Sequence, residues 1–414
     1  MRSQYNHDRQ SSLSGGGGFR ALPMGIWALG FVSLFMDISS ELIHSLLPVF
    51  MATTLGASMI AIGLIEGGAE ATASITKVFS GTISDYFRKR KLLAVLGYGL
   101  AAITKPIFPL ANTIGWVFGA RFIDRIGKGI RGAPRDALVA DIVPCDLRGA
   151  AYGLRQSLDS VGAFIGPLLA VIFMAWFAND IRTVLWIAVL PAFIAVAILV
   201  FAVREPEKTE INSGVQSPVT LMGIKRLPFR YWLIVLLSAV FTLARFSEAF
   251  LVLRAQSVGL GLGYVPVILI VMNAVYAATA YPLGIVADRM HPRTLLIIGL
   301  AVLVIANIVL ADAASLLPTF IGAAFWGLHM GLTQGLFAKL VADTAPAALR
   351  GTAFGIFNLV GGSALLMASA IAGALWSVFG ASATFLAGAA FATLALIGLI
   401  LYRRKPQTVK KEST

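Results

Sequence analysis

Long apolar runs separated by short polar segments dominate the pattern of this chain. A run of about 20 apolar residues is long enough to cross a bilayer as an α-helix. The sequence holds twelve runs of about this length, and we predict an all-α membrane protein with twelve transmembrane helices. The predicted spans are 24–50, 58–83, 91–111, 113–133, 150–176, 182–203, 230–254, 264–286, 293–312, 316–340, 351–378 and 382–402.

The distribution of charge supports this interpretation and predicts an orientation. The 414 residues are 58% hydrophobic and only 13% charged, whereas soluble proteins carry about 25% charged residues. The net charge of +13 would suit a nucleic-acid partner, but Lys and Arg gather in alternate connections, as the positive-inside rule describes. We therefore expect a lipid bilayer and no nucleic acid as partner, with both termini in the cytoplasm of a bacterial inner membrane. The basic connections are 88–91, 131–148, 204–230, 289–293, Arg350 and 403–405.

An internal repeat divides the chain into two halves. The pattern that runs from Val139 through Asp141 to Gly153 recurs from Val341 through Asp343 to Gly355, 202 positions later. Such a repeat predicts two six-helix bundles of the same orientation, related by an axis along the membrane normal. The predicted division is a cytoplasmic tail 1–23, a first bundle 24–203, a cytoplasmic linker 204–229, a second bundle 230–402 and a tail 403–414.

Charged residues at membrane depth point to a transport pathway. Arg121, Asp124, Arg125 and Lys128 share one helical face, and Arg155 and Asp159 form an i, i+4 pair on the next helix. Each charge costs about 2.5–3.5 kcal/mol at the centre of a bilayer, so the stripe must face protein or a water-filled cavity. Further polar residues on predicted helices are Asp37, Glu41, His44, Glu66, Glu70, Lys77, Arg245, Glu248, Asn273, Tyr276, His329, Gln334 and Asn358.

Three motifs resemble the major facilitator superfamily of transporters, and the resemblance covers residues 24–402. Residues 81–90 resemble the loop motif GxLaDrxGrkr, with Arg88 in place of its second glycine. Residues 121–127 resemble the helix 4 motif RxxQGxG, with Arg125 in place of a glycine. Gly153, Gly162, Gly166 and Pro167 resemble the antiporter motif of helix 5, although Ala170 and Val171 replace its final glycines.

The resemblance implies roles for these residues. In the family the loop carboxylate and its basic neighbours hold the halves together on the cytoplasmic side, and the helix 4 arginine takes part in proton coupling. We expect Arg121 to contact Asp37 or Glu41 and to respond to their protonation, and the alternative is a static ion pair. The expected gating residues are Asp85, Arg88, Lys89, Arg90, Asp288 and Arg289, and the expected packing residues are Gly153, Gly162, Gly166 and Pro167.

The polar residues are divided between two expected roles. The first half is richer in charge, so we assign it most of the proton coupling and let both halves share substrate recognition. The expected coupling residues are Asp37, Glu41, Arg121, Asp124, Arg155 and Asp159. The expected substrate-binding residues are Glu66, Glu70, Lys77, Arg245, Glu248, Asn273, Tyr276, His329, Gln334 and Asn358. We interpret His44 as a packing or hydrogen-bonding residue and not as a metal ligand.

The expected function is secondary active transport by alternating access, as proton-coupled efflux of a small organic molecule or drug by a monomer. The first alternative is proton-coupled uptake of an organic anion or a metal chelate, and a lesser one is a membrane sensor or scaffold that does not transport. An enzyme is not expected, because the sequence shows no nucleophile–base set, phosphate-binding loop or metal-ligand spacing. The single cysteine, Cys145, excludes an intrachain disulfide. We expect no metal and no cofactor.

The predicted topology can be tested with reporter fusions. A reporter fused after Pro206 and one fused after Lys410 should both report the cytoplasm, because the two sites lie on the basic side of the predicted helices. An external signal at either site would contradict the predicted repeat of two bundles with one orientation.

Overall fold

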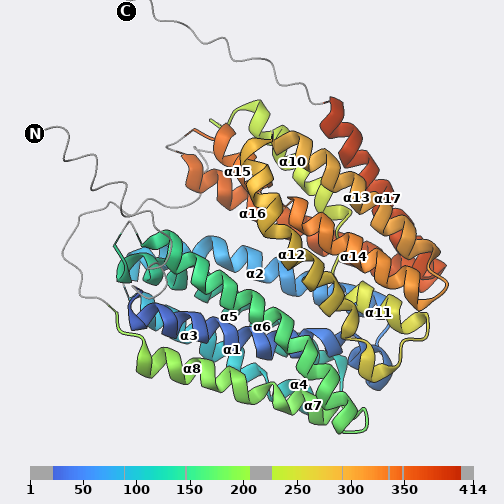
Figure 1. The fold of residues 1–414 in the computed structure, drawn as a ribbon, viewed down its shortest axis with the longest axis horizontal. Coiled ribbons are helices and arrows are strands. Elements are labelled where there is room, and N and C mark those ends of the chain that lie inside the picture. Colours follow the sequence, from blue (N-terminus) through green and yellow to red (C-terminus); the bar gives the residue numbers. More distant parts are fainter. Residues whose placement is uncertain are drawn as a thin grey trace, which may run out of the picture.

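The computed structural model describes residues 22–87, 89–144, 147–205, 226–290, 292–333, 336–346 and 349–401. These residues form helices joined by short turns, and none of them forms a strand, which confirms the predicted all-α fold. Figure 1 shows two bundles packed side by side, one coloured blue to green and the other yellow-green to red. Residues 206–225 of the predicted linker lie outside the described part, and the predicted domain boundaries stay a prediction.

Helices of the first bundle occupy the predicted spans. They are α1 (Met24–Val49) with the π-helical turn η2 (Phe50–Thr54), α2 (Met59–Phe87), α3 (Arg90–Thr104), α4 (Ile107–Leu110), α5 (Ile114–Ile142), α6 (Arg148–Trp176), α7 (Ile181–Ile187) and α8 (Val189–Ala202). The second bundle holds α10 (Phe229–Leu243), α11 (Ala249–Ser257), the 3-10 turn η3 (Leu262–Tyr264), α12 (Val267–Arg289), α13 (Pro292–Asp312), α14 (Leu316–Thr333), α15 (Leu336–Thr344), α16 (Arg350–Phe379) and α17 (Ala381–Leu401).

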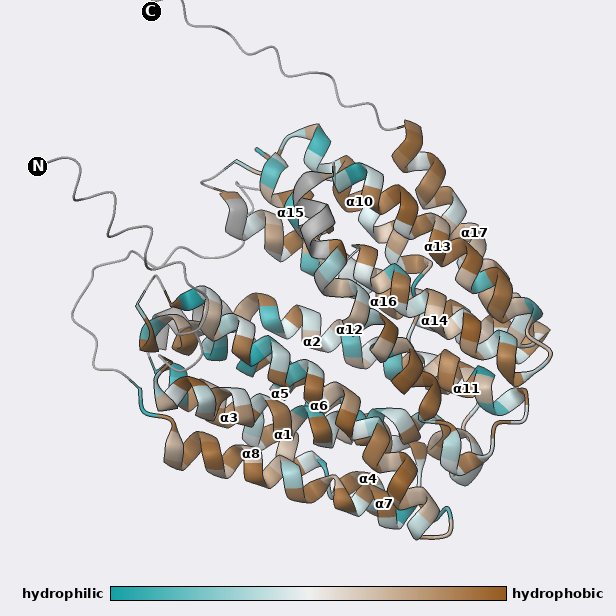
Figure 2. Cartoon of the chain, viewed as in Figure 1, coloured by the Kyte–Doolittle hydropathy of each residue, from teal (hydrophilic) through white to brown (hydrophobic). Residues whose placement is uncertain are grey.

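Nine helical stretches of the described residues are long and apolar enough to cross a membrane. The predicted spans 58–83 and 113–133 are helical as well but fall outside this set, because charged and small polar residues lower their hydropathy. Figure 2 shows mainly hydrophobic residues on α8, α13 and α17, whereas hydrophilic residues recur along α2 and α5. The passage of all twelve predicted spans through the bilayer stays a prediction.

The internal repeat has a counterpart in helix packing. Gly97 on α3 packs against the backbone of α5, and Gly299, 202 positions later, packs against α14. Lys91 donates a hydrogen bond from Nζ to the carbonyl of Val200 at the end of α8 (2.7 Å). Arg293, again 202 positions later, donates to the carbonyl of Leu399 near the end of α17 (3.1 Å). The two halves therefore repeat their internal contacts as well as their sequence.

Close backbone contact joins the two bundles where α2 crosses α16. Gly63 and Gly67 on α2 leave room for the backbone of α16 around Leu366 and Ser369, and Gly373 leaves room for the first residues of α2. Small residues permit this approach because a helix in lipid gains stability from tight packing. All of these contacts lie in the first part of α2 and the later part of α16. They hold the bundles together at the end away from the basic connections.

The predicted span 230–254 is wrong as one continuous helix. Residues 244–248 are not helical and separate α10 from α11. This break contains neither glycine nor proline, so no local pattern in the sequence predicted it. The backbone N–H of Ser247 donates to Oγ of Ser369 on α16 (3.1 Å), which replaces a helical hydrogen bond. The break lies at the junction of the bundles, where it presents side chains to the space between them.

The close contact of α2 and α16 at Gly63, Gly67 and Gly373, here called the glycine crossing, can be tested with two alanine variants on α16. A Cβ at Gly373 would lie 3.0 Å from Cα of Ile60, whereas a Cβ at Gly361 would meet no heavy atom within 4 Å. Gly373→Ala should therefore destabilise the protein by about 1–3 kcal/mol through overpacking. Gly361→Ala should be neutral or stabilise by up to about 1 kcal/mol, because alanine favours helix. Melting temperatures of the purified protein in detergent measure the difference, and equal shifts would contradict the assignment.

Candidate functional site

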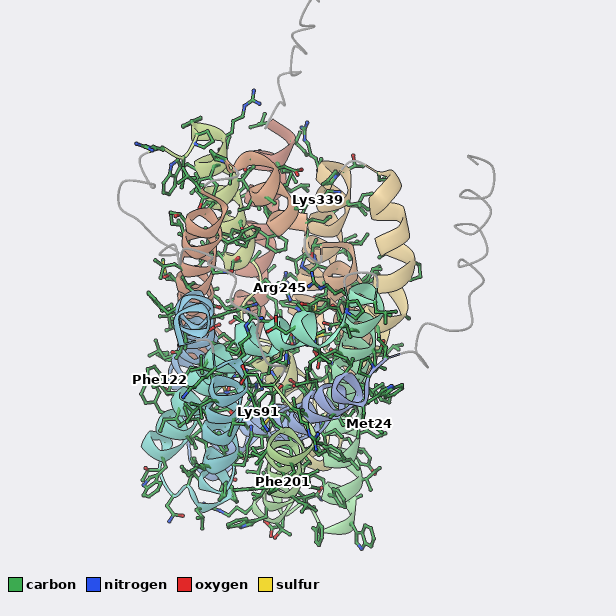
Figure 3. All side chains as sticks on the ribbon, turned by 90° about the vertical axis from the view of Figure 1, so that its left-hand side faces the viewer. Met24, Lys91, Phe122, Phe201, Arg245 and Lys339 are labelled. Atoms are coloured by element: carbon green, nitrogen blue, oxygen red, sulfur yellow. The ribbon has the colours of Figure 1, made fainter. Side chains whose placement is uncertain are left out.

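A polar cavity of about 410 Å³ lies between the two bundles. The first bundle contributes residues of α1, α2 and α5, and the second contributes the break between α10 and α11 and one residue of α16. Figure 3 places Arg245, from this break, near the middle of the molecule where the bundles meet. The lining residues are Glu41, His44, Glu70, Arg125, Lys128, Phe241, Thr242, Arg245, Phe246, Ser247, Glu248 and Leu365.

A second polar cavity of about 340 Å³ continues from the first along the inner face of the first bundle. The two cavities share the side chains of Glu41, Glu70 and Lys128. The predicted charged faces of four helices thus surround one polar region. The second cavity is lined by Asp37, Glu41, Glu70, Ala73, Ser74, Lys77, Lys128, Gly129, Arg131, Gly132, Arg135, Asp136 and Asp159.

Arg121 lies at the centre of a buried cluster beside the cavity. Its Nη2 donates to Oε2 of Glu66 (2.7 Å), and the same nitrogen lies 2.9 Å from Nδ1 of His44. The side chains of Arg121 and Glu66 are 2% and 0% exposed. The ring of His44 reaches the cavity and connects the buried pair to it.

Helix geometry explains why the ion pairs form a ladder. Glu66 and Glu70 are four residues apart on α2, and Arg121 and Arg125 are four apart on α5. The two helices run side by side in the same direction, so the second pair forms one turn after the first, with Nη1 of Arg125 3.2 Å from Oε1 of Glu70. Because the spacing is equal on two parallel helices, each of the two arginines lies beside one glutamate, and the buried charges are compensated.

The prediction for the partner of Arg121 is corrected by this ladder. Arg121 pairs with Glu66 on α2, and its expected partners Asp37 and Glu41 make no ion pair with any described residue. Both of these acids line the second cavity. Glu66, which was expected to bind substrate, is fully buried behind Arg121 and lines neither cavity. The helical period defined the charged faces correctly but left the choice between neighbouring helices open.

Lys105 is a buried member of the site that the sequence analysis missed. Its Nζ donates to Oδ1 of Asp124 (3.0 Å) and to Oγ of Ser40 (3.1 Å), and the residue is 1% exposed. It follows α3 directly and precedes Pro106, so it resembles a helix-terminal residue in the sequence. The signal that could have found it is a lone lysine inside the apolar run 91–111.

A second group of charges joins α5 to α6. Nη1 of Arg155 lies 2.6 Å from Oδ2 of Asp159, as the i, i+4 spacing predicted, and its Nε lies 3.7 Å from Oδ1 of Asp136. Gly162 and Gly166 of α6 pack against α1: a Cβ at Gly166 would lie 2.8 Å from Cβ of Glu41. The two glycines thus bring α6 against the acidic face of α1.

The remaining packing and gating predictions have mixed outcomes. A Cβ at Gly153 would meet nothing within 4 Å, so close packing does not require glycine there, and Pro167 lies inside α6. Lys89 is exposed, whereas Arg90 pairs with Asp141 (2.7 Å) inside the first bundle. The side chains of Asp85, Arg88, Asp288 and Arg289 lie outside the part of the chain that is described.

Residues of the second bundle divide between the cavity and the core. Arg245 and Glu248, which were expected to bind substrate, line the cavity between the bundles. Lys77 of the first bundle, with the same expected role, lines only the second cavity. His329 is fully buried in the core, with Nδ1 2.9 Å from the carbonyl of Gly299, and this position disfavours substrate contact. Asn273, Tyr276 and Asn358 are partly buried and line neither cavity, and Gln334 lies outside the described residues.

No group of three or more His, Cys, Asp and Glu side chains in the described part of the chain is placed to hold a metal ion.

Comparison with known proteins found a matching family model, related sequences and solved structures with a similar fold. A family model described as Major Facilitator Superfamily matches residues 29–369 and 249–414. An uncharacterized MFS-type transporter of Methanocaldococcus jannaschii is 33% identical over 390 residues, which cover 92% of this chain and 95% of the relative. Tetracycline resistance protein, class H, of Pasteurella multocida is 25% identical over 305 residues, covering 68% of this chain and 72% of that protein. A crystal structure of a mutant of the nucleoside transporter NupG has a TM-score of 0.79 at 12% identity, covering 91% of this chain and 98% of its own.

The buried ion pair can be tested by removing one partner and then both charges. Arg121→Ala strands the carboxylate of Glu66 and should cost about 3–5 kcal/mol of stability. Adding Glu66→Gln to that variant removes the stranded charge and should recover part of the loss. Arg155→Ala is the matched control and should cost less, because water reaches its partner Asp159, whose side chain is 16% exposed. Melting temperatures in detergent report the order, and a missing recovery in the double variant would contradict it.

Proposed function

The chain belongs to the Major Facilitator Superfamily, and we propose that it is a secondary active transporter that exports a small organic molecule in exchange for protons. The observation that carries this proposal is the polar cavity between the bundles, which His44 lines and connects to the buried pair of Arg121 and Glu66. A cavity formed by two repeated halves suits alternating access, in which the halves rock about a fixed site. The close contacts between α2 and α16 supply the closed end.

His44 is the proposed entry point of the proton into the buried cluster. A guanidinium can only donate hydrogen bonds, so Nδ1 of His44 must accept from Arg121, which leaves its ring neutral. A proton taken up at Nδ1 would break this bond and turn an N–H toward Oε2 of Glu66, now 3.7 Å away. Protonation of one ring would therefore change the partners of Arg121. This mechanism adds His44 and Glu66 to the coupling residues expected from the sequence.

Asp37 and Glu41 remain the second set of proposed coupling residues. They lie at the cavity without an ion pair among the described residues, and Gly162 and Gly166 bring α6 close to them. Protonation of either acid would change the charge of the face that α1 presents to α6. In the same proposal Asp124, Arg155 and Asp159 stabilise the surrounding charges, and Asp85 and Asp288 hold the cytoplasmic gate.

The direction of transport is proposed from one relative. The tetracycline resistance protein of P. multocida, matched over 68% of this chain, has a name that associates it with drug resistance, and this association favours export. Uptake of an organic anion is the second candidate, because the cations of Lys128 and Arg245 line the cavity without an acidic partner among the described residues. We place the protein as a monomer in the bacterial cytoplasmic membrane with both termini inside.

Transport into inside-out vesicles under an imposed pH gradient tests this proposal. Drugs, organic acids and metal chelates form the panel, and substrate and proton fluxes are measured on the same vesicles. An exporter should concentrate its substrate inside these vesicles only while their lumen is acidic. Substrate accumulation that does not depend on the pH gradient would contradict proton coupling. Substrate accumulation only in right-side-out vesicles would favour uptake.

The coupling residues can be separated by three substitutions. His44→Gln keeps an acceptor for Arg121 but cannot take up a proton, so it should abolish uphill accumulation while exchange of substrate across the membrane persists. Asp37→Asn and Glu41→Gln should leave uphill transport partly intact if the cluster of His44, Glu66 and Arg121 carries the proton. If His44→Gln transports normally and a carboxamide variant does not, Asp37 or Glu41 carries the proton instead.

A further inference from the structure

Four charged side chains line the cavity between the bundles without an ion pair. They are Glu41 on α1, Lys128 on α5, and Arg245 and Glu248 in the break between α10 and α11. None of the four makes a hydrogen bond or ion pair through its side chain with another described residue. The other full charges of the lining, Glu70 and Arg125, compensate each other at 3.2 Å. The unpaired set therefore contains two acids and two cations.

Each bundle contributes one unpaired charge of each sign. The first bundle supplies Glu41 and Lys128, and the second supplies Arg245 and Glu248. The cavity is therefore lined by two unpaired acids and two unpaired cations, and each bundle contributes one of each sign.

The break in the seventh predicted span fixes two of these charges. Arg245 follows the carboxyl end of α10, and Glu248 precedes the amino end of α11. A cation at a helix C-terminus and an anion at a helix N-terminus are both stabilised by the helix dipole. The hydrogen bond from the N–H of Ser247 to Ser369 holds the backbone between them (3.1 Å). The two charges are therefore presented on a backbone that is anchored to α16.

Charge balance selects the class of ligand that fits this cavity. A ligand with only a positive group would compensate Glu41 and Glu248 but would strip water from Lys128 and Arg245 without replacing it. A ligand with only a negative group would do the reverse. A zwitterion compensates both the acids and the cations and leaves the net charge of the cavity unchanged. Phe241, Phe246 and Leu365 add an apolar wall that suits a hydrocarbon or aromatic body.

We propose that the cavity binds a small zwitterion that carries one ammonium group, one carboxylate and an apolar body. The carboxylate contacts Lys128 and Arg245, because their cations can donate charge-assisted hydrogen bonds to it. The ammonium group contacts Glu41 and Glu248. Each ionic group of the ligand thus contacts both bundles, so binding joins them. The proposal rests on the proposed transport function for its physiological meaning, but the binding preference can be measured separately.

Three probes with one apolar body test the ligand class. Phenylalanine, phenethylamine and 3-phenylpropionate differ in whether they carry both ionic groups, only the amine or only the carboxylate. Binding to the full-length purified protein in lipid nanodiscs is measured by calorimetry at neutral pH. Phenylalanine should bind at least about tenfold more tightly than either single-charge probe, since each additional charged hydrogen bond contributes about 1.5 kcal/mol or more.

Two variants should redirect this preference in opposite ways. Arg245→Gln should weaken the binding of phenylalanine about tenfold and leave the binding of phenethylamine unchanged or tighter. Glu248→Gln should weaken the binding of phenylalanine to a similar extent and leave the binding of 3-phenylpropionate unchanged or tighter. Arg230→Gln, at an exposed position outside both cavities, is the matched control and should leave all three affinities unchanged. Each variant is first compared with the parent by melting temperature, and Arg245→Met replaces Arg245→Gln if the latter does not fold.

The outcomes separate this proposal from the transport function. Equal affinity for the three probes, a preference for a single-charge probe, or no binding of phenylalanine at millimolar concentration would each overturn the zwitterion assignment. Proton-driven flux of another compound would then still support transport. If phenylalanine is preferred and the variants redirect the preference, but no flux follows a pH gradient, the binding site stands and proton coupling is wrong.

Discussion

Compensation of charge at membrane depth is the constraint on which this structure depends. The ion pair between Arg121 and Glu66 is almost completely buried, and removal of either partner would leave an isolated charge far from bulk water. The parallel run of α2 and α5 allows a second pair one turn later, and Lys105 compensates Asp124 from α3. Three helices of the first bundle are therefore held together by charges as well as by apolar packing.

The second bundle shows that the fold itself does not need these charges. The repeat places Leu269 and Ala323 where the first bundle has Glu66 and Arg121, at offsets of 203 and 202 positions. It likewise places Asn307 and Trp326 where the first bundle has Lys105 and Asp124. The corresponding helices, α12 and α14, still pack closely, with Gly327 and Gly331 at their contact. The second bundle therefore reaches the same helix packing with uncharged side chains at these positions.

Much of the architecture follows from the sequence, because apolar runs, the repeat and the charged helical faces depend on periodicity alone. The partner of Arg121 could not be predicted from the sequence, because a helical period defines the charged face of a helix but not which neighbouring helix packs against that face. The break at residues 244–248 could not be predicted either, because a hydrogen bond from the N–H of Ser247 to Oγ of Ser369, 122 positions away, replaces the local helical bond. Lys105 resembled the end of a helix, and only the packing of α3 against α5 shows that it is buried.

Ser369 connects two parts of the molecule that would otherwise be independent. Its carbonyl and Cβ lie at the glycine crossing with α2, near Gly63 and Gly67, and its hydroxyl holds the backbone between Arg245 and Glu248. A shift of one bundle over the other along this crossing must therefore displace the anchor of the two charged side chains. In the proposed transport cycle, a movement of the bundles would therefore also move Arg245 and Glu248. Selection for a different ligand in this lineage would have to preserve the crossing and act instead on side chains such as Phe241 and Leu365.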